Sequence, residues 1–307
     1  MIQRKHFEWK LKSRSFLLGE RTLILGAINV APDSTAGGKF QDVDRAFAQA
    51  ILLEEQGADI IDIGAESTKP TVARISEAEE LRRLAPILKR LRGALRIPIS
   101  VDTWKAGVAD KALELGAEII NDPSGLTWDP QLVKSVVKHD AGFVLAHMRG
   151  TPETWAKLPP VKDMMNTVGA DLDAAFHRAL RGGVSRKAVV LDPGIGFGKR
   201  REQNVELLAR LGSLQSLDAP VLVGASHKAF VAKTDSSQAE SLSAAAAAAA
   251  VLRGAHLVRV HDVRLAKPAV ELADSLLQVR QEEEPERGPA PVRPALRPAR
   301  RPAPYRS

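Results

Sequence analysis

The sequence predicts a single α/β domain folded as a (β/α)8 barrel. Apolar runs that end in polar residues recur along the 307-residue chain, and segments with an apolar residue at every third or fourth position lie between them. The apolar runs do not alternate with polar residues, which is typical of parallel strands covered on both faces. This alternation of strand and helix over about 250 residues fits one closed barrel better than two smaller domains.

Eight apolar runs are candidate barrel strands. In a (β/α)8 barrel, or TIM barrel, the loops that follow the strands build the active site, so we expect the polar ends of these runs to converge. The runs with their polar ends are LILGAINVAPDS (23–34), DIIDIGAESTKP (59–70), IPISVDT (97–103), EIINDPSG (118–125), FVLAHMRG (143–150), LDPGIGFGKRREQN (191–204), PVLVGASHK (220–228) and LVRVHDVR (257–264).

Amphipathic segments predict helices over 44–57, 76–93, 104–116 and 166–183. Capping-box pairs and C-terminal glycines mark the expected helix ends. These residues are Ser76 with Glu79, Ser237 with Glu240, and Gly57, Gly93, Gly116 and Gly182. A doubly wound open sheet is the alternative architecture, but no GxGxxG motif follows the first strand.

Three segments are expected along the chain: a cap over 1–21, the barrel over 22–280 and a Pro/Arg-rich tail over 281–307. Residues 7–19 predict a short hairpin that covers the bottom of the barrel, because Gly19 and Glu20 separate it from the first strand. The stretch 287–307 holds six arginines and no acid, so it carries all but one of the seven net positive charges. Its composition predicts disorder, with at most weak contacts to RNA or other polyanions.

Composition excludes several classes of protein. With 44% hydrophobic residues the chain can bury a large core, and with no cysteine it has neither disulfides nor thiol nucleophiles. The first residues lack the apolar core of a signal peptide, and no run reaches 18 apolar residues. We therefore expect a cytoplasmic protein without membrane segments.

The strand ends carry two sets of polar side chains that suit two parts of a ligand. Acids and amides match a flat heterocycle rich in N–H and C=O groups, and cationic donors match a phosphate or diphosphate. The first set is Asp102, Asn121, Asp122 and Asp192, and the second is Lys228, Arg259 and His261. Each acid alone could simply cap the following helix, but four buried acids or amides together require partners.

The motifs NVAPDS, GADIIDIGAESTKP, ISVDTWK, AEIINDPSG, VLAHMRGTP, LDPGIGFGK, PVLVGASHK and VRVHDV together resemble the dihydropteroate synthase family. The resemblance is collinear from about residue 9 to 275. It implies condensation of 6-hydroxymethyl-7,8-dihydropterin diphosphate with 4-aminobenzoate to give 7,8-dihydropteroate and diphosphate. It also implies the barrel fold, Mg²⁺, a homodimer formed by the last helices and inhibition by sulfonamides.

The resemblance assigns roles to the matching positions. For the pterin it implies Asp102, Asn121, Met148, Asp192, Phe197, Gly224 and Lys228. For the diphosphate it implies Asn29, Arg259 and His261, with Mg²⁺ bound to the side-chain carbonyl of Asn29. For the 4-aminobenzoate side it implies Ser67, Thr68, Lys69, Pro70, Phe197, Ser226 and His227. Asp102, Lys228, Arg259 and His261 would act in catalysis, with Asp102 offsetting the charge of a cation-like methylene.

Three loops depart from the family pattern. NVAPDSTAGG replaces NVTPDSFSDGG, AESTKP replaces GESTRP, and SHK replaces SRK, which places Ala31, Thr35, Ala36, Ala65, Lys69 and His227 at altered positions. All three loops shape the aryl-amine side. The changes predict normal binding of the pterin diphosphate but weak binding of 4-aminobenzoate and sulfonamides, with low turnover; neutral drift with full activity is the alternative.

Two other functions remain open at this point. A pterin-dependent methyltransferase would share the barrel and the pterin-binding acids, but it has no need of the LDPGIGFGK, SHK and RVHD combination that serves a diphosphate. A non-catalytic pterin-binding protein is the second alternative. It would bind the pterin diphosphate without releasing diphosphate.

Overall fold

The computed structural model describes residues 4–31, 43–224 and 236–283, and eight parallel strands form its central sheet. The strand order is β8-β7-β6-β5-β4-β3-β10-β9. A bridge between Leu191 and Val221 joins the two end strands, and the Leu191 amide donates to the Pro220 carbonyl at 2.9 Å. The predicted barrel is therefore confirmed. Its strands are β3 (Leu23–Asn29), β4 (Ile60–Gly64), β5 (Ile99–Asp102), β6 (Ile119–Asp122), β7 (Gly142–Ala146), β8 (Val189–Asp192), β9 (Leu222–Val223) and β10 (Leu257–Val260).

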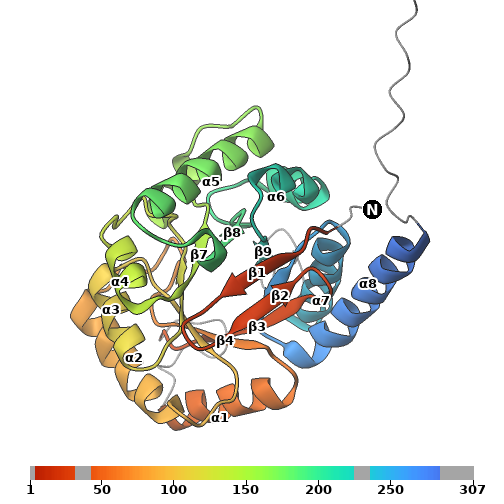
Figure 1. Cartoon of the computed structure of the whole chain (residues 1–307). Helices are drawn as coiled ribbons and strands as arrows, with labels where there is room; N and C mark the ends of the chain where they lie inside the picture. The colour runs from red at the N-terminus through yellow and green to blue at the C-terminus, as the bar shows by residue number, and fades with distance from the viewer. Residues whose placement is uncertain (1–3, 32–42, 225–235, 284–307) are drawn as a thin grey trace, which may run out of the picture.

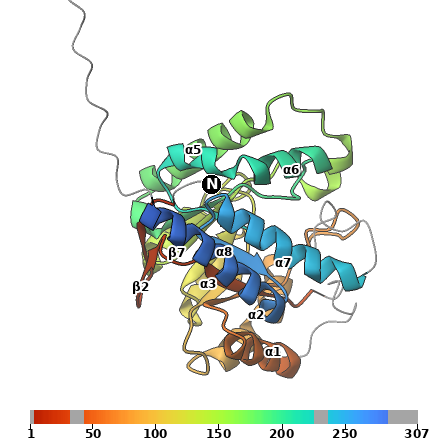
Figure 2. The same cartoon turned by 90° about the vertical axis from the view of Figure 1, so that its right-hand side faces the viewer.

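Helices surround the sheet as an outer ring (Figure 1). They bury one face against the strands, and α7 and α8 lie side by side (Figure 2). The helices are α1 (Val43–Glu55), α2 (Glu77–Leu91), α3 (Ala106–Glu114), α4 (Leu132–His139), α5 (Met164–Arg181), α6 (Arg201–Ala209), α7 (Ser236–Leu252) and α8 (Val263–Glu283), with short 3-10 turns η1 (Pro152–Lys157), η2 (Arg186–Ala188) and η3 (Leu211–Leu217).

Most predicted helix ends are confirmed, and two differ. The Ser76 hydroxyl accepts from the Glu79 amide at 3.2 Å at the start of α2. Because α7 begins at Ser236, Ser237 is its second residue and not the cap before it. Gly182 keeps a right-handed φ of −75°, and Gly183 takes the left-handed turn at +98°. Gly182 is needed for space instead, because a Cβ there would collide with Val133.

The predicted N-terminal hairpin is present and seals one end of the barrel. Strands β1 (Phe7–Lys10) and β2 (Ser15–Leu18) pair antiparallel. Trp9, Leu11 and Leu18 are almost completely buried against the first residues of the barrel strands. The Trp9 indole donates to the Ala188 carbonyl at 2.9 Å. This apolar end is the bottom of the barrel, and the strand ends with the polar residues form the mouth.

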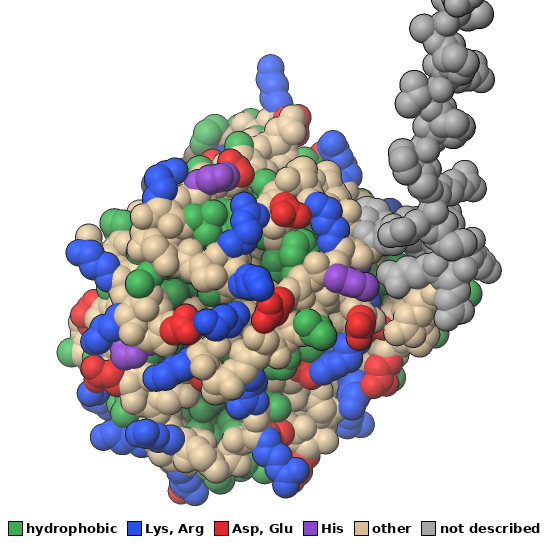
Figure 3. Space-filling view, viewed as in Figure 1, with side chains coloured by type: hydrophobic (Ala, Val, Ile, Leu, Met, Phe, Trp, Pro, Cys, Tyr) green, Lys and Arg blue, Asp and Glu red, His purple; other side chains and the backbone are tan. Residues whose placement is uncertain are grey.

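The last helix runs to Glu283, three residues beyond the boundary expected at 280. The tail that was expected to be disordered lies almost wholly in residues 284–307, outside the described residues. On the face that carries the hairpin, Lys and Arg side chains are spread among Asp and Glu without a single basic patch (Figure 3). None of the described helices is long and apolar enough to cross a membrane.

Candidate active site at the barrel mouth

Four barrel strands bring charged and amide side chains together at the mouth. The Arg259 guanidinium on β10 contacts Asp62 on β4 through Nε at 2.6 Å and Asp102 on β5 through Nη2 at 3.3 Å. Asn121 on β6 donates to the same Asp62 oxygen at 3.4 Å. The predicted residues Asp102, Asn121 and Arg259 therefore converge around a carboxylate that sequence reasoning missed.

Asp62 is fully buried, and one of its carboxylate oxygens has no hydrogen-bond partner among the described residues. Burial by itself lowers the pKa of Arg259, but the negative charges of Asp62, Asp102 and Asp192 raise it more, so the net shift is upward. The arginine therefore stays charged. The only sequence signal for Asp62 was an acid inside the apolar run DIIDIG, where burial demands a partner.

Two glycines keep the backbone bare beside these acids. A Cβ on Gly64, at the end of β4, would stand 3.6 Å from an Asp102 oxygen. A Cβ on Gly224, just after β9, would stand 3.9 Å from an oxygen of Asp192 on β8 and 3.7 Å from the Arg259 Cβ. Asp192 and Gly224 thus border the same cluster. The other Asp192 oxygen accepts from the Gly194 amide at 2.7 Å.

Asn29 and His261 lie on the side of the mouth where β3 and β10 end. Their side chains meet at 3.0 Å, Asn29 Nδ2 to His261 Nε2. The Asn29 carbonyl oxygen points toward Gly64, where a Cβ would be 3.7 Å away. No group of three or more acids, histidines or cysteines suited to a metal occurs among the described residues. A lone amide oxygen nevertheless fits Mg²⁺ that is held mainly by phosphate oxygens and water.

Asp122 does not belong to the ligand-facing set, contrary to the sequence prediction. Successive side chains of a strand point to opposite faces, so Asp122 points away from the side on which Asn121 lies. Its carboxylate accepts from the Ser124 amide at 2.8 Å, the Ser124 hydroxyl at 2.7 Å and the Leu126 amide at 2.6 Å. Asp122 therefore caps the loop that follows β6.

The glycine-rich loop after β8 is tied down by a lysine. Gly194 has a φ of +64°, and a Cβ there would collide with the His147 carbonyl. The Lys199 ammonium donates to the carbonyls of His147 at 3.1 Å, Gly194 at 2.7 Å and Phe197 at 3.3 Å. This geometry explains why the motif needs its glycines and its lysine. It fixes the loop on the end of β7.

Phe197 and Met148 occupy the same side of the mouth. The Phe197 ring lies 5.8 Å from the Trp155 ring in an edge-to-face arrangement. Met148, two residues after β7, is 8% exposed. The contacts with the pterin and the aryl amine that were expected of Phe197 and Met148 remain predictions.

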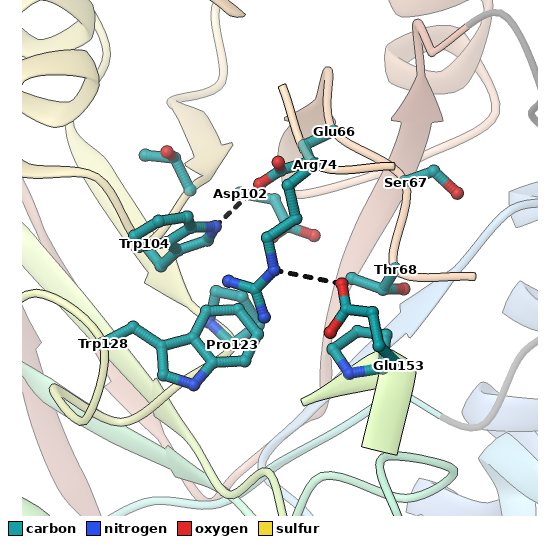
Figure 4. Close-up of a pocket in the computed structure, with 11 residues that line it drawn as sticks. Glu66, Ser67, Thr68, Arg74, Asp102, Trp104, Pro123, Trp128 and Glu153 are labelled. Atoms are coloured by element: carbon teal, nitrogen blue, oxygen red, sulfur yellow. Dashed lines mark hydrogen bonds and ion pairs between the residues drawn. The ribbon is translucent and has the colours of Figure 1, made fainter. Parts of the chain in front are cut away.

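The loop after β4 holds the predicted 4-aminobenzoate residues. Ser67 and Thr68 line a pocket that also includes Asp102, Trp104 and Trp128 (Figure 4). Lys69 and Pro70 are exposed. Ala65 is fully buried in the barrel core, so its methyl group packs against apolar neighbours and not at the mouth.

A buried network behind this loop was also missed. Glu66 accepts from the Trp104 indole at 2.7 Å and from the Lys105 ammonium at 3.0 Å. Lys105 also donates to the fully buried Glu80 at 2.5 Å. Burial raises the pKa of Glu80, although Lys105 opposes this shift. No local sequence signal pairs residues this far apart.

Ser226, His227, Lys228, Thr35 and Ala36 lie outside the described residues. The roles expected for them remain predictions.

Comparison with known proteins decides the family. A family model described as pterin binding enzyme matches residues 25–261. The dihydropteroate synthase of Synechocystis is 40% identical over 263 residues, which covers 84% of this chain and 91% of the relative. That of Clostridium beijerinckii is 37% identical and covers 88% and 99%. The chain belongs to the dihydropteroate synthase family.

Solved structures of this family have the same fold. A Yersinia pestis dihydropteroate synthase with a sulfonamide drug superposes with a TM-score of 0.84 at 33% identity, covering 89% of this chain and 100% of that one. A Xanthomonas albilineans dihydropteroate synthase with 4-aminobenzoic acid gives 0.81 at 35% identity, with coverage of 89% and 98%. The predicted family, barrel fold and transferase class are confirmed. The synthase names of these relatives favour the synthase over a pterin-dependent methyltransferase.

Proposed function

We propose that this chain condenses 6-hydroxymethyl-7,8-dihydropterin diphosphate with 4-aminobenzoate at the barrel mouth. One observation carries the proposal: Asp62, Asp102, Asn121 and Arg259 form a connected polar cluster at the open end of a dihydropteroate synthase barrel. Such a cluster is costly to bury without a ligand that uses it. Related dihydropteroate synthases have been solved with pteroic acid and with 4-aminobenzoic acid, which suit the two halves of this site.

The pterin would lie against the acids. Asp102 and Asp192 would accept from its ring N–H groups, and Asn121 would match a neighbouring donor and acceptor. Lys228, Met148, Phe197 and Gly224 keep the pterin roles that the family resemblance implies. Asp62 is added as a positioning residue, because it holds the Arg259 guanidinium at 2.6 Å.

The diphosphate would lie toward Asn29, His261 and Arg259. Asn29 would bind Mg²⁺, which supplies positive charge to the diphosphate oxygens when it is bound. The methylene C–O bond breaks and the electron pair leaves with the diphosphate. Asp102 offsets the positive charge that develops on the carbon. The 4-aminobenzoate nitrogen forms the new C–N bond and releases a proton, so no enzyme nucleophile is needed.

We also propose a homodimer formed through α8. Leu272, Leu276 and Val279 are 64%, 47% and 57% exposed and follow one face of this helix. An exposed apolar stripe of this kind is typical of a surface that packs against another molecule. Leu276→Glu should convert a dimer into a monomer in sedimentation experiments, whereas a monomeric wild-type protein would refute the dimer.

Calorimetry with the pterin diphosphate, beside a diphosphate-release assay with 4-aminobenzoate, tests the function. The wild type should bind the pterin and release diphosphate. Asp192→Asn should weaken pterin binding by about 10-fold to 100-fold, because an amide sets a donor against a ring N–H, at about 1–3 kcal/mol for each unsatisfied group. Asp122→Asn is the matched control, since Asp122 faces away from the site, and its pterin affinity should stay unchanged.

Two results would contradict the assignment. Tight pterin binding without diphosphate release would identify a non-catalytic pterin-binding protein. Methyl transfer with a corrinoid partner would identify the methyltransferase. Weak 4-aminobenzoate and sulfonamide binding together with measurable turnover would instead identify the altered loops as tuning the second substrate.

A further inference from the structure

The loop between β4 and α2 is anchored at both of its ends. At the first end, the two Glu66 carboxylate oxygens accept from the Ile75 amide at 2.9 Å and from the buried Lys105 at 3.0 Å. These contacts join the start and the end of the loop across its base. The residues that the proposed function places beside 4-aminobenzoate, Ser67 to Pro70, lie between the anchors.

Arg74 forms the second anchor. Its guanidinium carbon lies 3.9 Å from the centre of the Trp128 ring and 5.4 Å from that of Trp104. The two indoles are perpendicular, with centres 5.3 Å apart. The Arg74 Nε contacts a Glu153 oxygen at 3.2 Å. Figure 4 shows the guanidinium between the indoles and Glu153, at the edge of the pocket.

These contacts connect four barrel loops. Arg74 belongs to the loop after β4, Trp104 follows β5, Trp128 follows β6, and Glu153 lies in η1 after β7. The Arg74 and Glu153 side chains are 32% and 45% exposed, so their ion pair alone contributes little. A guanidinium stacked on an indole adds a preferred geometry as well as attraction. The stack therefore restrains the end of the loop that carries Arg74.

Arg74 and the residues expected beside the second substrate share one pocket. Ser67, Thr68, Arg74 and Glu153 line it together with Asp102. A displacement of Arg74 would therefore move the wall that faces 4-aminobenzoate. Of the residues proposed to bind the pterin, Asp102 borders this pocket, whereas Asn121 on β6 and Asp192 on β8 do not line it.

We propose that Arg74, stacked on Trp128 and Trp104 and paired with Glu153, is a clamp that positions Ser67 to Pro70 for the second substrate. Arg74 is a positioning residue in this role, since it acts through the loop. The inference rests on the proposed function, because it assigns the clamp to the aryl-amine half of that site.

The test compares the KM values of the two substrates. Arg74→Gln and Trp128→Leu should each raise the KM for 4-aminobenzoate by about 5-fold to 20-fold, with less than a twofold change for the pterin diphosphate. Glu153→Gln should have a smaller effect in the same direction. Trp128→Phe, which keeps an aromatic ring under the guanidinium, should have a KM for 4-aminobenzoate close to that of the wild type and well below that of Trp128→Leu. Arg82→Gln is the matched control, because it removes another exposed arginine–glutamate pair, on α2. It should change neither KM.

Hydrogen exchange provides a readout that does not need turnover. The amides of residues 66–75 should exchange faster in Arg74→Gln than in the wild type or in Arg82→Gln, with the unfolding midpoint unchanged. Equal rises of both KM values, or unchanged exchange in this segment, would overturn the clamp. A wild-type protein with no condensation activity would overturn the proposed function. The clamp would still be tested in that case, by comparing hydrogen exchange at the Ile75 amide between Arg74→Gln and the wild type.

Discussion

The two ends of the barrel use the same strands in opposite ways. At the bottom, Trp9 and Leu11 of the hairpin close an apolar layer that is almost completely buried. At the mouth, the same sheet holds Asp62, Asp102 and Arg259 in ionic contact. The bottom is therefore filled by apolar side chains, and its described residues leave no room for a ligand. The mouth presents charged side chains to which a polar ligand can bind.

The difference separates the sources of stability and of function. Burial of apolar area stabilises the bottom of the barrel. Truncating a side chain there leaves a cavity, which lowers the free energy of unfolding. At the mouth, desolvation of the charged groups costs free energy that their attraction only partly offsets. We expect changes at the bottom to alter stability alone. Changes at the mouth should alter both, or activity alone.

The largest effect is expected at the mouth. Arg259→Met takes the cation away from the fully buried Asp62, so the free energy of unfolding should fall by about 3–5 kcal/mol and diphosphate release should become undetectable. Urea unfolding and the release assay measure the two effects. Adding Asp62→Asn should recover part of the stability but none of the activity. Recovery of activity in that double variant would show that Arg259 is only structural.

At the bottom, Trp9→Ala should lower the free energy of unfolding by about 3–5 kcal/mol. It removes a buried indole and its hydrogen bond to Ala188. Turnover per folded molecule should stay at the wild-type value, since the hairpin lies at the other end of the strands. Leu17→Ala, on the same hairpin at a position 71% exposed, should leave stability unchanged. A fall in turnover at temperatures where Trp9→Ala is folded would show that the bottom of the barrel also affects activity.

Two buried histidines, one at each end, sharpen the comparison through pH. Burial lowers the pKa of His256, at the bottom of the barrel, to about 4. The pKa of His147, near the mouth, is also lowered to about 4, mainly by burial and to a smaller extent by the positive charge of Lys199. His256 Nδ1 accepts from the Val221 amide at 3.1 Å, so protonation would set one N–H against another.

The sign of the pH effect follows from these shifts. The unfolded chain binds a proton on each histidine near pH 6.5, whereas the folded chain does so near pH 4. The contribution of each histidine to stability is therefore complete above pH 6.5 and is lost as the pH drops toward 4, by on the order of 2–3 kcal/mol. The buried Asp122 carboxyl, whose pKa is raised by burial to about 6, opposes this loss below pH 6. Urea unfolding between pH 4 and 7 measures this slope. His256→Gln should remove the part of the slope that belongs to His256, and a slope identical to that of the wild type would refute the assignment.

The order of the elements could be read from the sequence. Helices and strands follow local periodicity, and the hairpin over 7–19 is marked by Gly19 and Glu20, so both were predicted correctly. The turn around Gly194 was also predicted, because its left-handed backbone is a local requirement. The family resemblance named Asp102, Asn121 and Arg259, which the structure brings together.

Only the tertiary structure decided how these side chains pair. Asp62 and Arg259 are 197 residues apart in sequence, and Lys105 reaches Glu66 and Glu80 from another strand end. Whether an acid at a strand end faces the mouth, as Asp102 does, or caps its own loop, as Asp122 does, depends on the phase of the strand in the closed sheet. Local patterns do not fix that phase, because it is set by the register of the neighbouring strands around the barrel.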